Sequence, residues 1–155
     1  MVVGENEKQV RRLIDSVNAN RPDMLGVVVA RDVRVHPGTP GAAPDTEGIE
    51  DLTVAFGRFH AVFPDLHIAL DDVIATGDRI AARWTATGTH REELAGIPAT
   101  GRAVRWGGID VYRLDEGMIV EWWRNDDFVG LLLQLGRDPL SASPVDSDDE
   151  VPPGP

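Results

Sequence analysis

The sequence predicts an α+β fold, in which a curved antiparallel sheet with helices on its concave face forms a cone around a hydrophobic pocket. Two observations lead to this fold class. Up to Pro64, most apolar residues recur every three or four positions, which is typical of amphipathic helices. After Pro64 the apolar period changes to two, which is typical of strands. Helices followed by a run of strands favour an α+β domain with the helices on one face of the sheet.

The first half of the chain is predicted to hold two long helices, a second short helix and one strand. An amphipathic helix is expected over residues 5–19, because apolar residues recur at helical spacing (Val10, Leu13, Ile14 and Val17). Pro22 is placed to open the short helix, since proline suits the first helical position. Residues 32–36 alternate and predict a short strand. A strong helix then begins at Ile49 and ends before Pro64.

Between that strand and the strong helix lies a loop rich in glycine and proline, "PGTPGAAPDTEG", residues 37–48. A loop of this length inside a domain often borders or covers a binding site, and equally often is a plain connection. Both interpretations stay open for this segment.

The second half is predicted to form four strands and a last helix. The expected strands are 66–75, 79–90, 102–114 and 118–126, and the helix covers about 127–135. Residues 115–117, Asp-Glu-Gly, join the last two strands, and glycine at the third loop position predicts a type I turn with a glycine bulge. Asp126 or Asp127 is expected to cap the last helix.

Residues 1–136 are predicted to form one domain, and residues 137–155 a disordered acidic, proline-rich tail. The chain of 155 residues is long enough for one domain with a real core. From residue 138 on, the tail has five acids, no lysine or arginine, and five of the 11 prolines. Such a segment cannot bury enough apolar surface to offset the entropy lost on ordering.

Composition excludes several classes of function. The formal net charge of −11 argues against nucleic-acid binding, which needs a basic patch. There is no cysteine, so disulfides, thiolate chemistry and cysteine-bound metals are ruled out. No stretch approaches the roughly 18 apolar residues of a membrane span, and the N-terminus lacks the pattern of a secretory signal. We therefore expect a cytoplasmic protein that binds neither nucleic acid nor membrane.

The hairpin of residues 108–126 carries an acid and a base among aromatic residues. With residues 115–117 as the loop, alternation places Trp106, Asp110 and Tyr112 on the same face as Trp122 and Arg124. Asp110 and Arg124 then become diagonal neighbours, roughly 7–8 Å apart at the backbone. This face, with aromatic side chains and few polar groups, has the lining of a small-molecule pocket. The opposite face carries more charge and predicts solvent or a subunit interface, with Trp123 as a hint of a dimer.

Asp110 and Arg124 suggest an acid–base site that needs no cofactor. Burial makes a carboxylate a stronger base, because desolvation raises its pKa. A buried arginine stays charged and donates several hydrogen bonds, which suits an enolate or epoxide oxygen. The alternative, with equal weight, is a buried ion pair that only stabilises the hairpin.

The histidines and tryptophans give further candidates. His36, at the mouth of the Gly/Pro loop, is the preferred second acid–base residue, since histidine titrates near neutrality. His90, at a strand end, is a candidate for a ligand contact or a structural hydrogen bond. His60 is expected to be structural or exposed, and His67 to face solvent or a subunit contact. None of the four has metal-ligand spacing, so no metal is expected. Trp84, Trp106 and Trp122 either pack the core or form walls for a flat aromatic ligand.

Four segments of the second half form a distinctive combination: Gly88-Thr89-His90, "GIPATGR" at 96–102, "GIDVYR" at 108–113 and Gly130 through Gly136. Through these segments, residues 5–136 resemble the SnoaL-like polyketide cyclase family of the nuclear transport factor 2-like superfold. The resemblance implies a cone-shaped α+β barrel, usually oligomeric, that holds a hydrophobic ligand without a metal or organic cofactor.

The resemblance also implies a chemistry and the positions that perform it. Cyclases of the family close a ring in an aromatic polyketide by intramolecular aldol chemistry, using an aspartate on the last strand and a histidine on the strand before. The aspartate position falls on Arg124 and the histidine position on Asp110, so both differ here. Limonene epoxide hydrolases, which are related, also have an aspartate where Arg124 stands.

Taken together, the sequence predicts a cofactor-independent acid–base enzyme that cyclises or isomerises a hydrophobic, carbonyl-containing, polyketide-like molecule. The catalytic candidates are Asp110, Arg124 and His36, and the substrate-binding candidates are Trp106, Trp122, Tyr112, Trp84 and His90. Two alternatives remain: an epoxide hydrolase or epoxide-opening cyclase, and a non-catalytic ligand binder or dimeric interaction domain. A homodimer or higher homo-oligomer is expected in each case.

Overall fold

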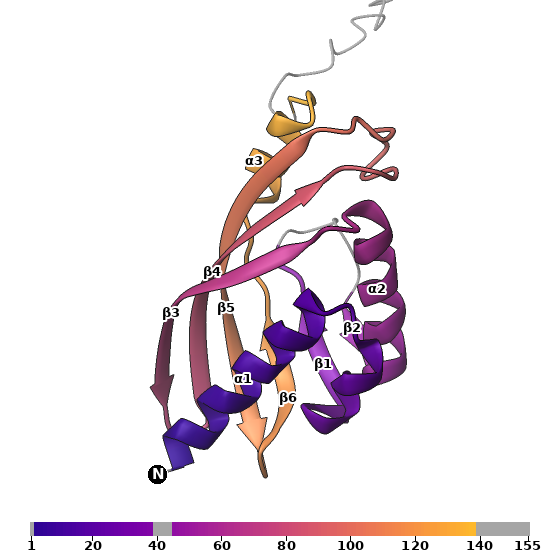
Figure 1. Cartoon of the computed structure of the whole chain (residues 1–155). Helices are drawn as coiled ribbons and strands as arrows, with labels where there is room; N and C mark the ends of the chain where they lie inside the picture. Colours follow the sequence, from indigo (N-terminus) through magenta and orange to yellow (C-terminus); the bar gives the residue numbers. More distant parts are fainter. Residues whose placement is uncertain (1, 39–44, 139–155) are drawn as a thin grey trace, which may run out of the picture.

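The helices of the first half begin and end close to where their apolar periods predict. The computed structural model describes residues 2–38 and 45–138 (Figure 1). Helix α1 covers Val2–Asn18, the 3-10 helix η1 covers Pro22–Val27, and α2 covers Ile49–Val62. Pro22 opens η1. The last residue of α2 is Val62, two positions before Pro64. The predicted tail lies outside the described residues from position 139 on.

Six strands form one sheet in the order β2-β1-β6-β5-β4-β3. Their bounds are β1 Val29–His36, β2 Thr46–Glu47, β3 His67–Thr76, β4 Arg79–Thr89, β5 Ala103–Asp115 and β6 Met118–Trp123. All neighbours are antiparallel except β1 and β6, which run parallel. The expectation of a wholly antiparallel sheet is thus wrong at one pair. Parallel neighbours need a long connection, and α2 with the three-strand meander supplies it.

The Gly/Pro loop contains a short strand that the sequence did not predict. Thr46 and Glu47 pair with Val35 and Arg34 at the edge of the sheet. Residues 39–44 of this loop lie outside the described residues.

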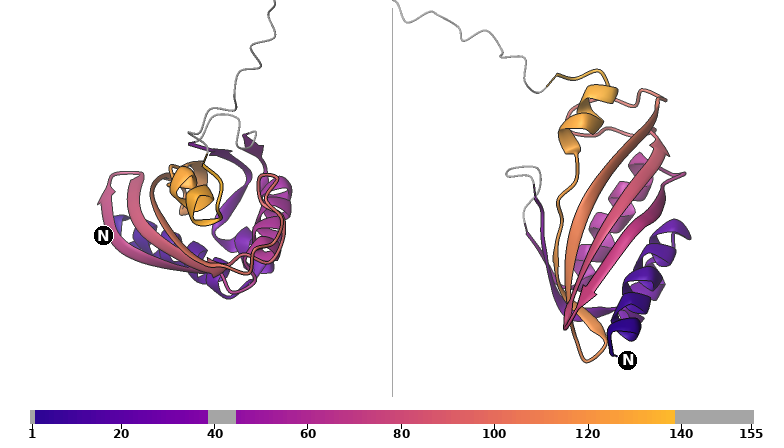
Figure 2. Two further views of the ribbon diagram at one scale, coloured as in Figure 1. Left: turned by 90° about the horizontal axis from the view of Figure 1, so that it is seen from above. Right: turned by 90° about the vertical axis from the view of Figure 1, so that its left-hand side faces the viewer.

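The sheet curves, and α1 and α2 lie across its concave side (Figure 2). The apolar stripe of α1 is buried there, with Val10 and Leu13 at most 1% exposed. Side chains of α2 and of the inner sheet face complete one core cluster. This arrangement confirms the predicted α+β class with helices on the concave face. None of the helices in residues 2–38 and 45–138 is long and apolar enough to cross a membrane.

The turn between β5 and β6 differs from the prediction. Asp115 pairs with Met118, so the loop has only two residues, Glu116 and Gly117, at φ 47° and 77°. Positive φ at both positions is the mark of a type I′ turn, whose twist matches that of a hairpin. The predicted three-residue turn, with Leu114 opposite Met118, is therefore wrong.

A β-bulge on β6 changes which side chains face inward. Leu114 pairs with Ile119, whereas Arg113 pairs with Glu121, so Val120 is the extra residue. Ile119 is fully buried although strict alternation from a three-residue loop placed it outward. Because one extra residue reverses the alternation, Trp122 returns to the inner face, where the sequence also placed it.

Helix α3, Phe128–Gln134, lies at the end of the sheet remote from the N-terminus (Figure 1). The Asp127 side chain accepts a hydrogen bond from the Gly130 backbone N–H at 2.9 Å, so the predicted cap is confirmed. The Gln134 amide pairs with the backbone of Arg105 through two hydrogen bonds of 2.9 and 2.7 Å. These bonds fasten α3 to β5.

Candidate functional site

A largely apolar cavity of about 410 Å³ lies between the two long helices and the concave face of the sheet. This volume falls in the range of small-molecule sites, about 300–1,000 Å³. Its walls come from α1 (Leu13, Ile14, Val17), α2 (Leu52, Phe56, Phe59, His60) and the sheet (Trp84, Ala86, Trp106, Asp110, Trp122). Polar side chains are few on this surface: Asp110, Arg124 and His60, together with Arg58 and Glu93, which are exposed residues.

The pairing of β5 with the chain after β6 brings Asp110 and Arg124 together. Val111 pairs with Trp123, and an isolated bridge joins Gly108 to Asp126. Both pairs have the same register, which puts Asp110 opposite Arg124. The predicted diagonal relation is therefore replaced by a direct one, as a consequence of the two-residue turn and the bulge. Residues directly opposite each other have Cβ atoms about 4.5–5.5 Å apart.

Asp110 is a buried carboxylate held by donors from neighbouring residues. It is 2% exposed. Its Oδ2 accepts hydrogen bonds from Trp122 Nε1 at 2.9 Å and, more weakly, from the Tyr112 hydroxyl at 3.4 Å. Its Oδ1 accepts one from the Asn125 backbone N–H at 3.3 Å. These bonds fix the orientation of the carboxylate at the cavity wall.

Burial is the dominant influence on the pKa of Asp110 and raises it above the ordinary value of an aspartate. The charge of Arg124 and the hydrogen bond from Trp122 act in the opposite direction but do not cancel this effect. The Trp84 indole N–H also helps to lower the pKa, although its distance or angle falls outside hydrogen-bond geometry. Asp110 is thus a stronger base than an aspartate in water.

Arg124 is close to Asp110 but does not form an ion pair with it. Among the described residues, no nitrogen of Arg124 lies within 4.0 Å of an Asp110 oxygen. The guanidinium carbon instead lies 5.4 Å from the centroid of a Trp122 ring, a cation–π contact. Its buried Nε has no hydrogen-bond partner. Arg124 therefore keeps donor capacity for a group in the cavity.

Three tryptophans form much of the sheet wall. Trp84 pairs with Gly108, and its indole crosses that glycine so closely that a Cβ there would be 2.6 Å from Trp84 Cζ2. Trp106 packs against the rings of Phe59 and Phe63, with centroids 6.0 and 5.0 Å apart. The indole nitrogens of Trp84 and Trp106 are buried without partners.

Two of the predicted substrate-binding residues do not line the cavity. Tyr112 is fully buried behind the wall, where its ring packs against Trp122 at 5.2 Å. His90 is also fully buried, and its Nδ1 pairs with Thr100 through the hydroxyl at 3.0 Å and the backbone N–H at 3.1 Å. Tyr112 therefore does not line the cavity but contacts Asp110, which does. His90 makes the structural hydrogen bond that was one of the two alternatives expected from the sequence.

His36 lies on the opposite face of the sheet from the cavity. It pairs with Trp123, whose side chain alternates with that of Trp122, and the two rings stack at 5.6 Å. Its Nδ1 bonds Asp45 at 3.0 Å and its Nε2 bonds Glu121 at 2.9 Å, and these bonds raise its pKa. The Arg124 backbone N–H donates to the His36 carbonyl at 2.8 Å, but the His36 side chain lies with Asp45, Glu121 and Trp123, away from the side chains of Asp110 and Arg124.

Sequence reasoning missed His60, which lines the cavity and is 7% exposed. A signal for it existed in the spacing, because His60 follows Leu52 and Phe56 by eight and four positions on the buried stripe of α2. His67, in contrast, is exposed, as expected. In the described part of the chain, no three acidic or histidine side chains gather where they could hold a metal ion.

Comparison with known proteins agrees with this fold. Aklanonic acid methyl ester cyclase DnrD of Streptomyces peucetius is 26% identical over 129 residues, which cover 83% of this chain and 88% of DnrD. Among solved structures, IdmH of Streptomyces antibioticus is 33% identical with a TM-score of 0.75, covering 85% of this chain and 99% of IdmH. TsrD of Streptomyces laurentii is 28% identical with a TM-score of 0.76, covering 86% and 96%.

The family assignment rests on the body of the chain. Residues 8–135 match the model of the SnoaL-like polyketide cyclase family. This range contains α2, α3, all six strands, the greater part of α1 and every residue of the cavity wall. The resemblance seen in the sequence is thereby confirmed. The chain belongs to the SnoaL-like polyketide cyclase family.

Proposed function

We propose that this protein is a cofactor-independent acid–base enzyme that cyclises or isomerises a hydrophobic, carbonyl-containing, polyketide-like molecule. Asp110 acts as the base and Arg124 as the donor to the developing oxyanion. The observation that carries the proposal is a buried carboxylate with a raised pKa that faces an unpaired arginine in an apolar cavity. A titratable group whose pKa is perturbed by burial and by a charged neighbour in a cavity is a candidate for a functional site.

The absence of a close ion pair supports the role of Asp110 as a base. An arginine in contact with a carboxylate lowers its pKa and weakens it as a base. Here the Arg124 guanidinium packs on Trp122, and no nitrogen of it reaches an Asp110 oxygen within 4.0 Å. Asp110 therefore keeps the basicity that burial gives it, while the charge remains near enough to stabilise an oxyanion.

Aldol closure would proceed in two proton transfers. Asp110 removes a proton from a carbon next to a carbonyl group, and the C–H electron pair passes into an enolate whose oxygen accepts hydrogen bonds from Arg124. The enolate carbon attacks a second carbonyl of the same molecule, and the new alkoxide takes the proton back from Asp110. In an isomerisation the proton returns to a different carbon. No redox partner is consumed in either case.

The first test is hydrogen–deuterium exchange at the acidic carbon of a substrate such as aklanonic acid methyl ester, the substrate named for the relative DnrD. Exchange in D2O reports proton removal even when ring closure does not follow. We expect Asp110→Asn to lower the enzyme-catalysed exchange by at least about a hundredfold, as for loss of a general base. The matched control is Asp115→Asn, an exposed carboxylate on the same strand, which should leave exchange unchanged.

Binding must be measured beside exchange. Asparagine has the shape of aspartate, so ligand affinity should change little in Asp110→Asn. Normal exchange in this variant would refute the proposed role of Asp110.

A non-catalytic ligand binder is the second candidate, and one observation favours it. Both oxygens of Asp110 already accept hydrogen bonds within the protein, as expected of a carboxylate that holds the hairpin together. In that case wild-type protein binds aklanonic acid methyl ester but does not accelerate exchange. The epoxide alternative, in which Asp110 activates water or a hydroxyl while Arg124 supports the leaving oxygen, would show as turnover of an epoxide without exchange of the ketone.

A further inference from the structure

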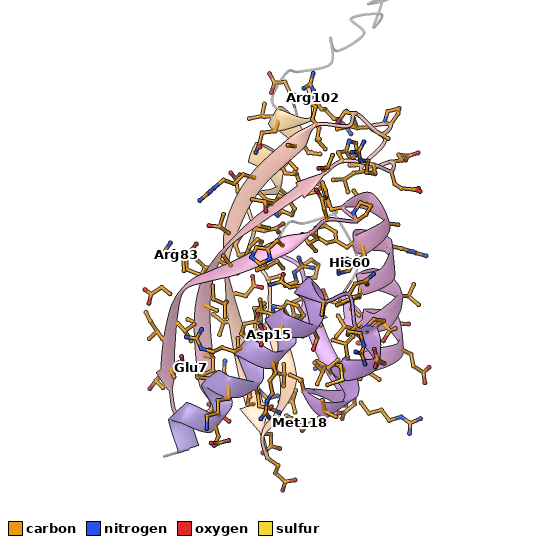
Figure 3. The ribbon with its side chains drawn as sticks, in the orientation of Figure 1. Glu7, Asp15, His60, Arg83, Arg102 and Met118 are labelled. Carbon is orange, nitrogen blue, oxygen red and sulfur yellow. The ribbon has the colours of Figure 1, made fainter. Side chains whose placement is uncertain are left out.

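His60 is a buried, ionisable side chain of the cavity that the proposed chemistry does not use. It lies near the C-terminal end of α2 and is 7% exposed, and Figure 3 shows it between α2 and the sheet. Its ring packs against that of Phe56, with centroids 4.7 Å apart. It belongs to the helical wall of the cavity, whereas Asp110 and Arg124 belong to the sheet wall.

Neither ring nitrogen of His60 has a hydrogen-bond partner. This is unusual, because roughly 90% or more of buried polar groups are paired, and an unpaired one weakens the fold. An apolar residue would pack as well at this position, and the nearby Val17 carbonyl can serve only one of the two ring nitrogens. A polar group on a bound ligand would satisfy the ring.

The surroundings of the ring indicate which kind of group that is. Burial lowers the pKa of His60, so the ring is neutral at pH 7 and has one donor and one acceptor nitrogen. The Val17 carbonyl lies near enough to favour the protonated ring, although not in hydrogen-bond geometry. A carbonyl only accepts hydrogen bonds, so the tautomer whose N–H faces Val17 is favoured. The lone pair of the other nitrogen has no partner, and because this nitrogen exposes almost no surface to the cavity, a ligand hydroxyl reaches it after a small turn of the ring.

We propose that His60 is a ligand-binding residue whose free ring nitrogen accepts a hydrogen bond from a hydroxyl group of the ligand. The ligand would thus be hydroxylated on the side facing α2 and carry its reacting carbonyl on the side facing Asp110 and Arg124. This inference rests on the proposed function in that the cavity takes an organic ligand. It does not require turnover.

The test is equilibrium binding of two probes of nearly equal shape, 2-(hydroxymethyl)anthraquinone and 2-ethylanthraquinone, at pH 7.5. The first ends in a hydroxyl and the second in a methyl group, and neither substituent ionises. Binding is followed by quenching of tryptophan fluorescence, since three of the four tryptophans line the cavity. In His60→Phe, we expect the hydroxyl probe to lose affinity by about two- to tenfold, the range of one neutral hydrogen bond. The ethyl probe should change by less than about twofold.

Two further variants complete the design. His67→Phe is the matched control, because His67 is an exposed histidine on β3, and neither probe should be affected. His60→Gln retains an acceptor and a donor, so it should recover part of the selective affinity for the hydroxyl probe. His60→Gln also allows the selective affinity for the hydroxyl probe to be measured if His60→Phe fails to fold.

The proposal is overturned if His60→Phe weakens both probes equally, if it weakens neither, or if the wild type binds neither probe. The proposed function fails in a different way. If Asp110→Asn exchanges protons normally while the probe selectivity depends on His60, only the role of Asp110 is wrong. If exchange depends on Asp110 but selectivity does not depend on His60, only this inference is wrong.

Discussion

The hydrogen bond from Trp122 to Asp110 gives a quantitative test of the site. In Trp122→Phe the indole N–H that lies 2.9 Å from Asp110 Oδ2 is lost, while most of the ring remains. A hydrogen bond to an ionised group contributes about 1.5–3 kcal/mol. The ionised form of Asp110 should become less stable by this amount, so its ionisation constant should fall by about ten- to a hundredfold. Trp122→Phe should therefore raise the pKa of Asp110 further.

Carbon-13 NMR of the Asp110 carboxyl group, assigned through Asp110→Asn, measures this change during a pH titration. Trp106→Phe is the matched control, because Trp106 also lines the cavity but its indole nitrogen has no partner. The control removes the same ring atoms without removing a hydrogen bond. If Asp110 titrates alike in both variants, the indole N–H does not hold the carboxylate and the electrostatic account of the site is wrong.

Three further predictions concern stability, and each is measured by urea unfolding. Asp110 has a raised pKa in the folded state, so wild type should lose stability relative to Asp110→Asn as pH rises from about 4, the usual value for an aspartate, through the folded pKa. The carboxylates of Glu121 and Asp45 raise the pKa of His36 in the folded state. Its contribution to the free energy of unfolding is therefore present below about pH 6.5 and is lost as pH rises through the folded pKa. His36→Gln should lower the free energy of unfolding by up to about 1 kcal/mol at pH 6 and by less at pH 9. Asp127→Ala removes the cap on the Gly130 N–H and should lower the free energy of unfolding by about 0.5–2 kcal/mol.

The resemblance implies that the site differs from those of its family at two positions, with a catalytic aspartate expected where Arg124 stands and a histidine where Asp110 stands. In this chain the carboxylate comes from β5 and the cation from the segment after β6, and the two lie opposite each other. Under the proposed function, these two residues would form the acid–base pair in place of the family residues. We expect the substrate to lie with its acidic carbon nearer β5 than in those cyclases.

Most of the fold could be predicted from the sequence because its determinants are local. The apolar stripe of α1, the Pro22 start of η1 and the Asp127 cap each depend on residues within a few positions of one another. The inner face of the final hairpin was partly predictable for the same reason, since alternation links Trp106 to Asp110.

The register of that hairpin was not predictable in the same way. A two-residue type I′ turn normally prefers Asn-Gly or Asp-Gly, and here Glu116 takes the first positive φ. The bulge at Val120 then corrects the alternation so that Trp122 faces inward. The shorter turn and the bulge have opposite effects on which face Trp122 occupies, and only the observed strand pairing reveals both.

The sequence by itself determined the helices, five of the six strands and the side chains that could carry chemistry, because local periodicity and residue type are written along the chain. The tertiary structure decided which of those side chains meet. It placed His36 on the outer face with Asp45 and Glu121, put Tyr112 and His90 behind the wall, and brought His60 into the cavity. The reason is physical: the approach of α2 to the sheet and the pairing of β1 with β6 depend on packing between residues far apart in sequence, which no local pattern encodes.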